Sequence, residues 1–520
     1  MKQARTGADL LLSTASAFGV RACFANPGTT ELALVRALDN VKEIRPVLGL
    51  FEGVCTGAAD GYGRVSGLPA LTLLHLGPGL ANGMANLHNA RRAHTPVVNI
   101  VGDHATWHLP HDAPLSSDIQ GLASWASSRV IGLRAPAEIP TVMRTAIEAS
   151  RSIPGEIVTI IAPSDLMEHE LAVESRVTNP PLRRVAPTVV DEQRLGQVIQ
   201  VLRSGPTILL LGGDALTARA QQAAARIAAA TGARLIMESY PAIVQLGGNL
   251  PLLERLAYFP QDVIAQLRGA NVVLVGARAP VSYFGYPGQP SRLVPDERLI
   301  ELSGISDDCC LALESLADTL GAPPARSNAA VGLETSGDGT ALTPANVAER
   351  LATELPEGSI VSIEGSTCGG PYLQRAYQAK PHLVMTNTGG AIGQGIPCGL
   401  GAAIARPGSR VVCLQSDGSA QYTLQALWTL AREGLDVTVI IAANHRYGIL
   451  QTELRRAGAD LESDACAHMT RMDSPRIDWV ALASGYGLMA ERVENAESFQ
   501  HALRKSMHTP GPSLIECPLP

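Results

Sequence analysis

The chain has 520 residues, too many for one hydrophobic core, and the usual ~100–200 residues per domain predict three domains. Hydrophobic residues make up 46% of the sequence and charged residues 17%, which is typical of soluble α/β proteins with large buried sheets. The net charge of -7 comes with no basic stripe, and aromatic residues make up only 4%. Both observations argue against nucleic acid as a partner.

The N-terminal segment, Met1 to Val20, predicts an amphipathic helix rather than a signal peptide, because its apolar stretch is short and interrupted. No stretch reaches the ~18 apolar residues of a membrane span. The nine cysteines are scattered apart from the adjacent Cys309 and Cys310, and no CxxC pair is present, so neither a disulfide framework nor a cysteine metal site is expected. We therefore expect a soluble cytoplasmic protein that does not bind a membrane.

Two segments of linker composition divide the chain, residues 176–188 and residues 322–346. We predict domains over residues 1–175, 189–321 and 343–520. Short Val/Ile/Leu runs alternate with Ala-rich helical stretches in each part, which predicts an α/β fold of three doubly wound parallel-sheet domains. The strands expected in chain order are Ala70–Leu76, Val97–Val101, Thr207–Leu211, Asn271–Val275, Arg410–Gln415 and Val437–Ala443. The helices expected between them include Asn82–Arg92, Thr217–Thr231 and Tyr422–Glu433.

The last two of these strands predict a metal site. In a right-handed parallel crossover both strands end at one edge of the sheet, and Asp417 and Asn444 follow the two strands. A carboxylate and an amide oxygen are ligands that suit Mg²⁺, which shares its coordination with phosphates, and Gly418 lets the backbone come close. The backbone carbonyl near Arg446 is the expected third protein ligand. The alternative is that Asp417 only caps its helix and Asn444 lies in a turn.

A second segment, Gly337-Asp338-Gly339, matches the pattern GDG more literally. It lies in an expected linker with no apolar strand before it, and Ser362 to Gly365, which lie 24 to 27 residues downstream, include no Asn. The context therefore favours Asp417 over Asp338.

The segment SDGS…NHRYG resembles the cofactor motif of the thiamine-diphosphate decarboxylase and acetolactate synthase family, with Ser416 in place of the usual first Gly. The resemblance extends over nearly the whole chain and is closest to compact bacterial acetolactate-synthase-like proteins. It implies thiamine diphosphate and Mg²⁺ as cofactors, with a pyrimidine-binding, a central Rossmann-like and a diphosphate-binding domain. It also implies cofactor-binding residues, which are Asn26, Gly28, Glu364, Gly365, Ser366, Thr367, Gly390, Ile392, Gly418, Ser419, Tyr447, Gly448 and Ile449.

The same resemblance assigns proton transfer to the N-terminal part. Glu52, in the segment LGLFEGVCTGAADGYGR, matches the glutamate that hydrogen-bonds the aminopyrimidine ring, and its apolar flanks predict burial. Thr29, in FANPGTTE, stands at the active-site serine position of benzoylformate decarboxylase, and His75, in LLHLGPG, at a catalytic histidine position of that enzyme. Glu52 could instead be a carboxylate that a helix N-terminus favours, and His75 could be structural.

Other segments concern the diphosphate cradle and the substrate pocket. EGSTCGG, residues 364–370, and TNTGGAIGQGIP, residues 386–397, resemble the segments that hold the diphosphate and pyrimidine, and Ile392 matches the apolar residue that bends the cofactor. Pro114 and Leu115 resemble a decarboxylase pocket wall. Phe284 stands where benzoylformate decarboxylase has a second catalytic histidine, which argues against identical chemistry.

The leading hypothesis is a thiamine-diphosphate- and Mg²⁺-dependent 2-oxo acid decarboxylase or carboligase, in which the C2 ylid attacks the keto carbon, CO₂ leaves and the enamine is protonated or ligated. A 2-hydroxyacyl lyase is one alternative. A non-catalytic cofactor-binding paralogue that partners an active synthase subunit is another. The expected partners are a small 2-oxo acid or aldehyde and further copies of the chain, in a homodimer or homotetramer whose sites lie at subunit interfaces.

Overall fold

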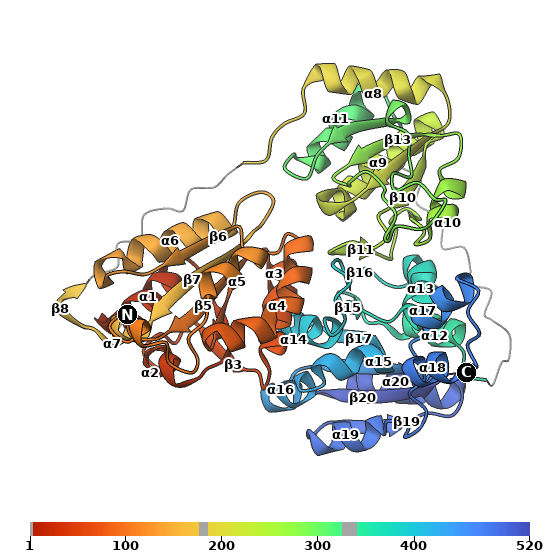
Figure 1. Ribbon diagram of the computed structural model, residues 1–520. Helices are drawn as coiled ribbons and strands as arrows, with labels where there is room; N and C mark the ends of the chain where they lie inside the picture. The colour runs from red at the N-terminus through yellow and green to blue at the C-terminus, as the bar shows by residue number, and fades with distance from the viewer. Residues whose placement is uncertain (1–3, 176–185, 325–340, 520) are drawn as a thin grey trace. The chain divides into compact units, whose positions relative to one another are not determined.

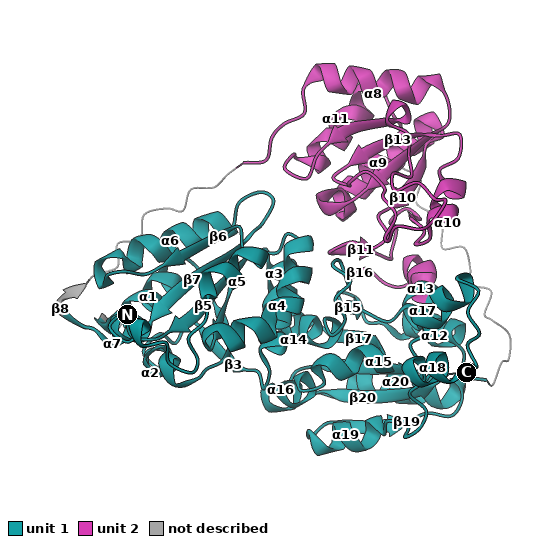
Figure 2. Ribbon diagram, in the orientation of Figure 1, with its two compact units in different colours: residues 1–184, 338–371, 387–520 teal, residues 185–337, 372–386 magenta. Residues whose placement is uncertain are grey.

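The computed structural model describes residues 4–175, 186–324 and 341–519, which form two compact units (Figures 1 and 2). Unit 1 comprises residues 1–184, 338–371 and 387–520, and unit 2 comprises residues 185–337 and 372–386. The described chain contains three parallel sheets covered by helices, so the predicted α/β class is confirmed. The division into three domains at residues 175, 189, 321 and 343 stays a prediction. Asp338 and its neighbouring glycines lie outside the described residues.

The first sheet of unit 1 is built from buried apolar runs, and its six strands are all parallel in the order β3-β2-β4-β5-β7-β6. The strands are β2 (Ala22–Asn26), β3 (Arg45–Leu48), β4 (Ala70–Leu74), β5 (Val97–Asp103), β6 (Arg129–Gly132) and β7 (Ile157–Pro163). The helices are α1 (Gly7–Ala17), α2 (Leu32–Leu38), α3 (Glu52–Ser66), α4 (Leu76–Arg92), α5 (Ile119–Ala126), α6 (Ile139–Ser150) and α7 (Ser164–Glu168). A short antiparallel pair joins β1 (Ala4–Thr6) to β8 (Glu170–Ser175).

Helix α1 differs from the amphipathic helix expected at the N-terminus, because residues 7–16 are all buried. It packs in the core beside α2 and α6, and this core also takes up apolar residues of the sheet. Burial of a hydroxyl is costly unless it finds a hydrogen-bond partner, and the helix backbone supplies one. Thr14, for example, donates its hydroxyl to the carbonyl of Leu10 at 2.7 Å.

The second sheet of unit 1 contains five parallel strands in the order β15-β17-β18-β20-β19. The strands are β15 (Ile360–Ile363), β17 (Val411–Ser416), β18 (Val437–Ala443), β19 (Met489–Arg492) and β20 (Ser513–Pro518). The helices are α12 (Pro344–Glu354), α13 (Ser366–Arg375), α14 (Gly395–Ala405), α15 (Asp417–Ala420), α16 (Ala426–Glu433), α17 (Gly448–Arg456), α18 (Asp464–Thr470), α19 (Trp479–Gly485) and α20 (Ala496–His508). The helix expected from Tyr422 therefore begins later, after a 3₁₀ turn at Gln421–Thr423.

Helices α3 and α14 pack against each other so closely that no side chain fits at two glycines of their contact. A Cβ on Gly61 would lie 2.0 Å from the carbonyl oxygen of Cys398, and a Cβ on Gly401 would lie 1.9 Å from the carbonyl oxygen of Ala58. Glycine is required at both positions because backbone atoms cannot move aside. This contact joins the helix that begins at Glu52 to the second sheet of unit 1.

Unit 2 has a five-stranded parallel sheet in the order β12-β10-β9-β13-β14 and an antiparallel pair of β11 with β16. The strands are β9 (Thr207–Leu211), β10 (Arg234–Met237), β11 (Val244–Leu246), β12 (Glu254–Arg255), β13 (Asn271–Val275), β14 (Leu299–Ser303) and β16 (His382–Thr386). The helices are α8 (Glu192–Ser204), α9 (Ala218–Thr231), α10 (Pro260–Gln266) and α11 (Cys309–Thr319). Strands β9 and β13 have the predicted bounds.

None of the described helices is long and apolar enough to cross a membrane. All nine cysteines are free thiols, as expected from their scatter in the sequence.

Candidate active site

Asp417 and Asn444 follow neighbouring strands of unit 1. Ser416, the last residue of β17, pairs with Ala442 of the parallel strand β18. The segments that follow the two strands therefore leave the sheet at the same edge. The Asp417 side chain is buried, and its two carboxylate oxygens accept the backbone N–H groups of Gly418 at 2.9 Å and His445 at 2.7 Å. Burial raises the pKa of Asp417, although these two N–H groups pull it back down.

Hydrogen bonds also hold Asn444 and the turn that follows it. The Asn444 amide nitrogen donates to the Thr367 hydroxyl at 3.3 Å, and its oxygen accepts the N–H of Arg446 at 3.2 Å. The Arg446 carbonyl accepts the N–H of Gly448 at 3.0 Å. The Arg446 carbonyl is thus already engaged in a turn, and its predicted role as a metal ligand would use its second lone pair.

Further residues of the predicted cofactor set lie around the same turn. A Cβ on Gly418 would be 2.8 Å from the ring of Tyr447, so this glycine makes room for the aromatic ring. Tyr447 precedes α17, which begins at Gly448, and Ile449 is exposed. Ser419 donates its hydroxyl to the carbonyl of Ser416 at 3.1 Å.

Ser416, the departure from the family motif, fits without strain. Its φ of -94° and ψ of 151° are extended values that any residue adopts. Its hydroxyl oxygen lies where a Cβ on Gly365 would come within 2.3 Å, so the small size of Gly365 accommodates it. Ser366, at the start of α13, is exposed. Ser416 is therefore compatible with the local backbone of the turn.

The donor set of this edge fits a hard cation. One carboxylate, one amide oxygen and one backbone carbonyl are oxygen ligands of the kind that Mg²⁺ takes together with phosphate oxygens. Among the described residues no group of three or more His, Cys, Asp or Glu side chains is placed to hold a metal ion. A site with a single carboxylate, completed by oxygens of a bound ligand, agrees with that observation.

Glu364 holds the loop between β16 and α14 rather than pointing out of it. Its carboxylate accepts the N–H groups of Gly393 at 2.6 Å, Gln394 at 3.0 Å and Gly395 at 2.9 Å. Removal from water raises the pKa of Glu364 to about 7, against the pull of these hydrogen bonds. Glu364 therefore fixes the backbone of the segment that carries Ile392.

The same loop contains a tight turn at Gly390, a residue of the predicted cofactor set. Gly390 has a φ of 80°, and its N–H donates to the side-chain oxygen of Asn387 at 2.8 Å. The Asn387 amide nitrogen donates to the carbonyl of Ala391 at 2.8 Å. Ile392 is half-buried at the end of this turn.

Glu52 is buried at the first position of α3, and two asparagines hold its carboxylate. Asn26, at the end of β2, donates its amide to Oε1 at 3.0 Å, and Asn82, in α4, donates to Oε2 at 3.0 Å. The two hydrogen bonds fix the orientation of the carboxylate plane. Asn26, expected to contact the cofactor, thus also orients Glu52.

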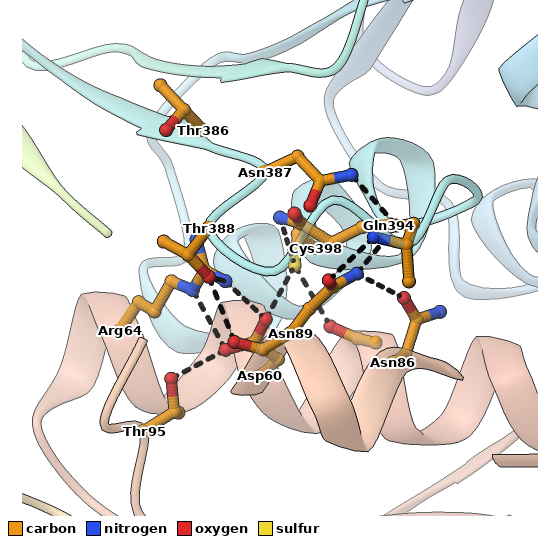
Figure 3. A network of polar contacts seen from close by, with 12 residues as sticks. Asp60, Arg64, Asn86, Asn89, Thr95, Thr386, Asn387, Thr388, Gln394 and Cys398 are labelled. Carbon is orange, nitrogen blue, oxygen red and sulfur yellow. Dashed lines mark hydrogen bonds and ion pairs between the residues drawn. The ribbon is translucent and has the colours of Figure 1, made fainter. Parts of the chain in front are cut away.

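Beyond Asn82, two further asparagines of α4, Asn86 and Asn89, lie beside the loop of residues 387–395 (Figure 3). Asn86 donates its amide to the carbonyl of Gly53 at 2.7 Å, and Asn89 exchanges hydrogen bonds with the backbone of Ala391 at 2.7 and 3.2 Å. Beside them Figure 3 shows the buried ion pair of Asp60 and Arg64, whose charged atoms lie 2.6 Å apart. Helix α4 therefore supports both Glu52 and the loop that carries Ile392.

His75 follows β4, and the turn after β2 lies beside it because Asn26 pairs with Leu74. Its ring Nδ1 is 2.8 Å from a carboxylate oxygen of Glu31 and 3.3 Å from the hydroxyl of Thr30. A Cβ on Gly28 would come within 2.3 to 2.5 Å of three ring atoms, so Gly28 packs on the imidazole. Thr29 is exposed, and its neighbour Thr30 makes the contact with the ring.

The predicted pocket residues lie in both units. Pro114 and Leu115 are exposed in unit 1, in the segment between β5 and α5. Phe284 is 57% exposed in unit 2, where its ring meets Tyr283 and Tyr286 at centroid distances of 5.8 and 6.4 Å. The substrate pocket formed by these residues stays a prediction.

Sequence reasoning missed several polar residues of this region. Asn82, Asn86 and Asn89 are spaced as one face of a helix, and this spacing was a signal in the sequence itself. Glu31 closes the segment FANPGTTE, and its partners Gly28 and Thr30 lie within that segment, but His75 does not. Its contact with His75 depends on the pairing of two strands.

Comparison with known proteins identifies this class of site. Residues 5–122 match the family model of the thiamine pyrophosphate enzyme N-terminal TPP binding domain, and residues 366–517 match that of the C-terminal TPP binding domain. These two matches include Glu52, His75, Asp417 and Asn444. The described fold and the two domains define a thiamine diphosphate enzyme.

Relatives match the chain from end to end. It is 46% identical over 521 residues to the "Putative acetolactate synthase large subunit IlvX" of Mycobacterium tuberculosis, with 99% of each chain covered. It is 27% identical over 540 residues to a benzoylformate decarboxylase of Pseudomonas aeruginosa, with 96% of each covered. The thiamine-diphosphate-dependent 4-hydroxybenzoylformate decarboxylase of Rhodococcus jostii RHA1 shares the fold, with a TM-score of 0.83, 24% identity and 99% of each chain covered. The chain belongs to the thiamine pyrophosphate enzyme family.

Proposed function

We propose that the protein is a thiamine-diphosphate- and Mg²⁺-dependent 2-oxo acid decarboxylase or carboligase. The observation that carries the proposal is the buried Asp417 carboxylate beside Asn444 in a chain that also buries Glu52 between two amides. The relatives named as acetolactate synthase and benzoylformate decarboxylase support this reaction class. The substrate is a small 2-oxo acid, with an aldehyde or a second oxo acid as acceptor in the ligase direction.

Each part of the site has a distinct task in this proposal. Asp417, Asn444 and the carbonyl of Arg446 would hold Mg²⁺, and the residues at Gly418–Ser419 and Tyr447–Ile449 would face the diphosphate. Bound thiamine diphosphate supplies a carbon nucleophile and an electron sink for decarboxylation. Glu52 would hold a proton at the aminopyrimidine nitrogen, and its two asparagines keep the carboxylate aimed.

Glu52→Gln is the direct test of the proton-transfer assignment. The variant keeps the size of the side chain and leaves Asn26 and Asn82 unchanged, but an amide cannot exchange a proton as a carboxyl group does. We expect the variant to bind thiamine diphosphate with Mg²⁺ but to lose turnover of a panel of 2-oxo acids. Turnover is measured as CO₂ release. Full turnover in Glu52→Gln would refute the assignment. Glu516→Gln is a matched control, because Glu516 is a buried glutamate of β20 paired with Arg492 at 3.0 Å.

The metal assignment has a separate test. Asp417→Asn keeps the size of the side chain and one of its two acceptor oxygens, but it removes the charge that a divalent cation needs. Titration calorimetry of thiamine diphosphate with and without Mg²⁺ should show cofactor binding that depends on Mg²⁺ in the wild type and loses that dependence in Asp417→Asn. Unchanged Mg²⁺ dependence in the variant would place the metal elsewhere.

The same substrate panel separates the alternatives. Cleavage of 2-hydroxyacyl donors without 2-oxo acid turnover would favour the lyase. Cofactor binding without turnover of any donor would favour the non-catalytic paralogue.

We propose further that the protein is cytoplasmic and works as a homodimer or homotetramer. Nine free thiols suit a reducing compartment. Large apolar side chains are exposed beside the site, including Leu50 next to Glu52 and Ile449 and Leu450 near Asn444. In the proposed assembly a further subunit covers these residues. Sedimentation velocity should give a mass of two or four chains, and a monomer would refute the assembly.

A further inference from the structure

A buried carboxylate beside His75 has no role in the proposal above. Glu31 ends the 3₁₀ turn Thr29–Glu31 in unit 1, and its side chain is 0% exposed. One oxygen accepts the N–H of Gly28 at 2.8 Å and lies 2.8 Å from Nδ1 of His75, and the other accepts the hydroxyl of Thr30 at 2.6 Å. A buried carboxylate is costly unless such donors surround it. The turn is therefore built around this charge.

These contacts determine which ring nitrogen of His75 carries a proton. The carboxylate can only accept hydrogen bonds, and the Thr30 hydroxyl gives its proton to Glu31. Both neighbours of Nδ1 consequently present an acceptor, so Nδ1 carries hydrogen. In the neutral ring the lone pair then lies on Nε2. The His75 side chain as a whole is 22% exposed.

Two glycines keep the pair in this geometry. Gly28 lies on the face of the imidazole, where a Cβ would be 2.3 Å from Nδ1 itself. Gly102, at the end of β5, lies against the carboxylate, where a Cβ would be 1.7 Å from Oε1 of Glu31. The carboxylate and the ring are thus packed between the backbone that follows β2 and the backbone of β5, and neither can rotate away freely.

We propose that Glu31 is a positioning residue that fixes His75 as the Nδ1–H tautomer, leaves Nε2 to accept or return a proton at the reacting substrate, and stabilises the imidazolium form. The inference rests on the proposed function, because His75 exchanges protons with substrate only if the site is active. Proton balance is simple. His75 takes the proton on Nε2 as its second ring proton, and the positive charge that results faces the negative charge of Glu31.

The tautomer is measurable without cofactor or turnover. Nitrogen-15 NMR of the histidine-labelled apoprotein, with His75→Gln to assign the signals, should show a protonated Nδ1 and an unprotonated Nε2. Glu31→Met removes the acceptor and should shift His75 toward the Nε2–H tautomer. Glu516→Gln, the matched buried glutamate, should leave these signals unchanged. An Nε2–H tautomer in the wild type, or His75 signals unchanged in Glu31→Met, would overturn the inference.

Kinetics of Glu31→Gln cover the case in which Glu31→Met does not fold. The amide oxygen can still accept from Gly28 and His75, so the tautomer should remain while the charge is lost. We expect kcat to fall about ten- to hundredfold with KM unchanged, the effect of a hydrogen bond to a charged group. An unchanged kcat in an active protein would overturn the role of the charge. A wild type that turns over no 2-oxo acid but shows the Nδ1–H tautomer would refute the proposed function alone.

Discussion

The amide of Asn82 offers a quantitative test of how Glu52 is held. Asn82→Leu keeps a side chain of similar volume in α4 but removes the donor that lies 3.0 Å from Oε2 of Glu52. The carboxylate is buried, so water does not readily replace the lost donor. A hydrogen bond to a charged group contributes about 1.5–3 kcal/mol, which corresponds to a roughly 10- to 150-fold change in rate.

The loss should appear where Glu52 acts. Asn26 still holds Oε1 at 3.0 Å, so the carboxylate stays in place but can rotate about that contact. We expect kcat/KM to fall by the factor given above. The rate of deuterium exchange at C2 of bound thiamine diphosphate, read by NMR after acid quench, should fall in parallel.

Asn40→Leu is the matched control. Asn40 also donates its amide to a buried carboxylate, Asp9, at 2.9 Å, but outside the site. This variant should lose a similar free energy of unfolding and keep the exchange rate. If the exchange rate in Asn82→Leu matches the wild type while the protein stays folded, the reasoning about Glu52 is refuted.

Three further predictions concern other parts of the chain. Gly28→Ala should cost activity at least as severely as loss of a catalytic hydrogen bond, because its Cβ would displace the ring of His75 by about 1 Å; unchanged kcat would contradict this. Ser416→Gly should lower the free energy of unfolding by about 0.5–1 kcal/mol in urea, since the extended backbone there does not need glycine; a stabilised variant would show hidden strain. Burial lowers the pKa of His382 to about 4 from 6.5, so only the unfolded chain is protonated between these values, and unfolding free energy should fall by about 3 kcal/mol from pH 6.5 to pH 4. In the native protein the Tyr372 hydroxyl lies 2.8 Å from Nε2 of His382, and His382→Gln keeps an acceptor for it. The variant should therefore show a weaker dependence of the unfolding free energy on pH in this range, measured by urea unfolding; an equally strong dependence would contradict the assignment to His382.

Local pattern and the rule for parallel crossovers were enough for the edge that carries Asp417 and Asn444. Two buried strands joined by one helix must end at the same edge, so the proximity of the residues that follow them is a property of about thirty consecutive residues. Strands β9, β13 and β18 were predictable from local pattern as well, because short continuous Val/Ile/Leu runs between helical stretches are typical of buried parallel strands. Glu52 at the start of a helix was likewise visible in its neighbours.

Contacts between segments distant in the chain were not predictable in this way. Glu31 meets His75 because β2 and β4 are neighbours in the sheet, and Asn82 reaches Glu52 because α3 and α4 pack side by side. The carboxylate of Glu364 binds the backbone of the loop that follows β16, a contact that the sequence did not indicate, and its contact with the cofactor stays a prediction.

The division between sequence and tertiary structure follows from the range of the interactions. The residues proposed as oxygen donors and the carboxylate proposed for proton transfer belong to short motifs, which local structure presents at strand and helix ends. The orientation of Glu52, the tautomer of His75 and the shape of the loop around Ile392 depend on hydrogen bonds from other segments. Those bonds form only when strand order and helix packing bring the segments together, which the amino-acid pattern of any one segment does not encode.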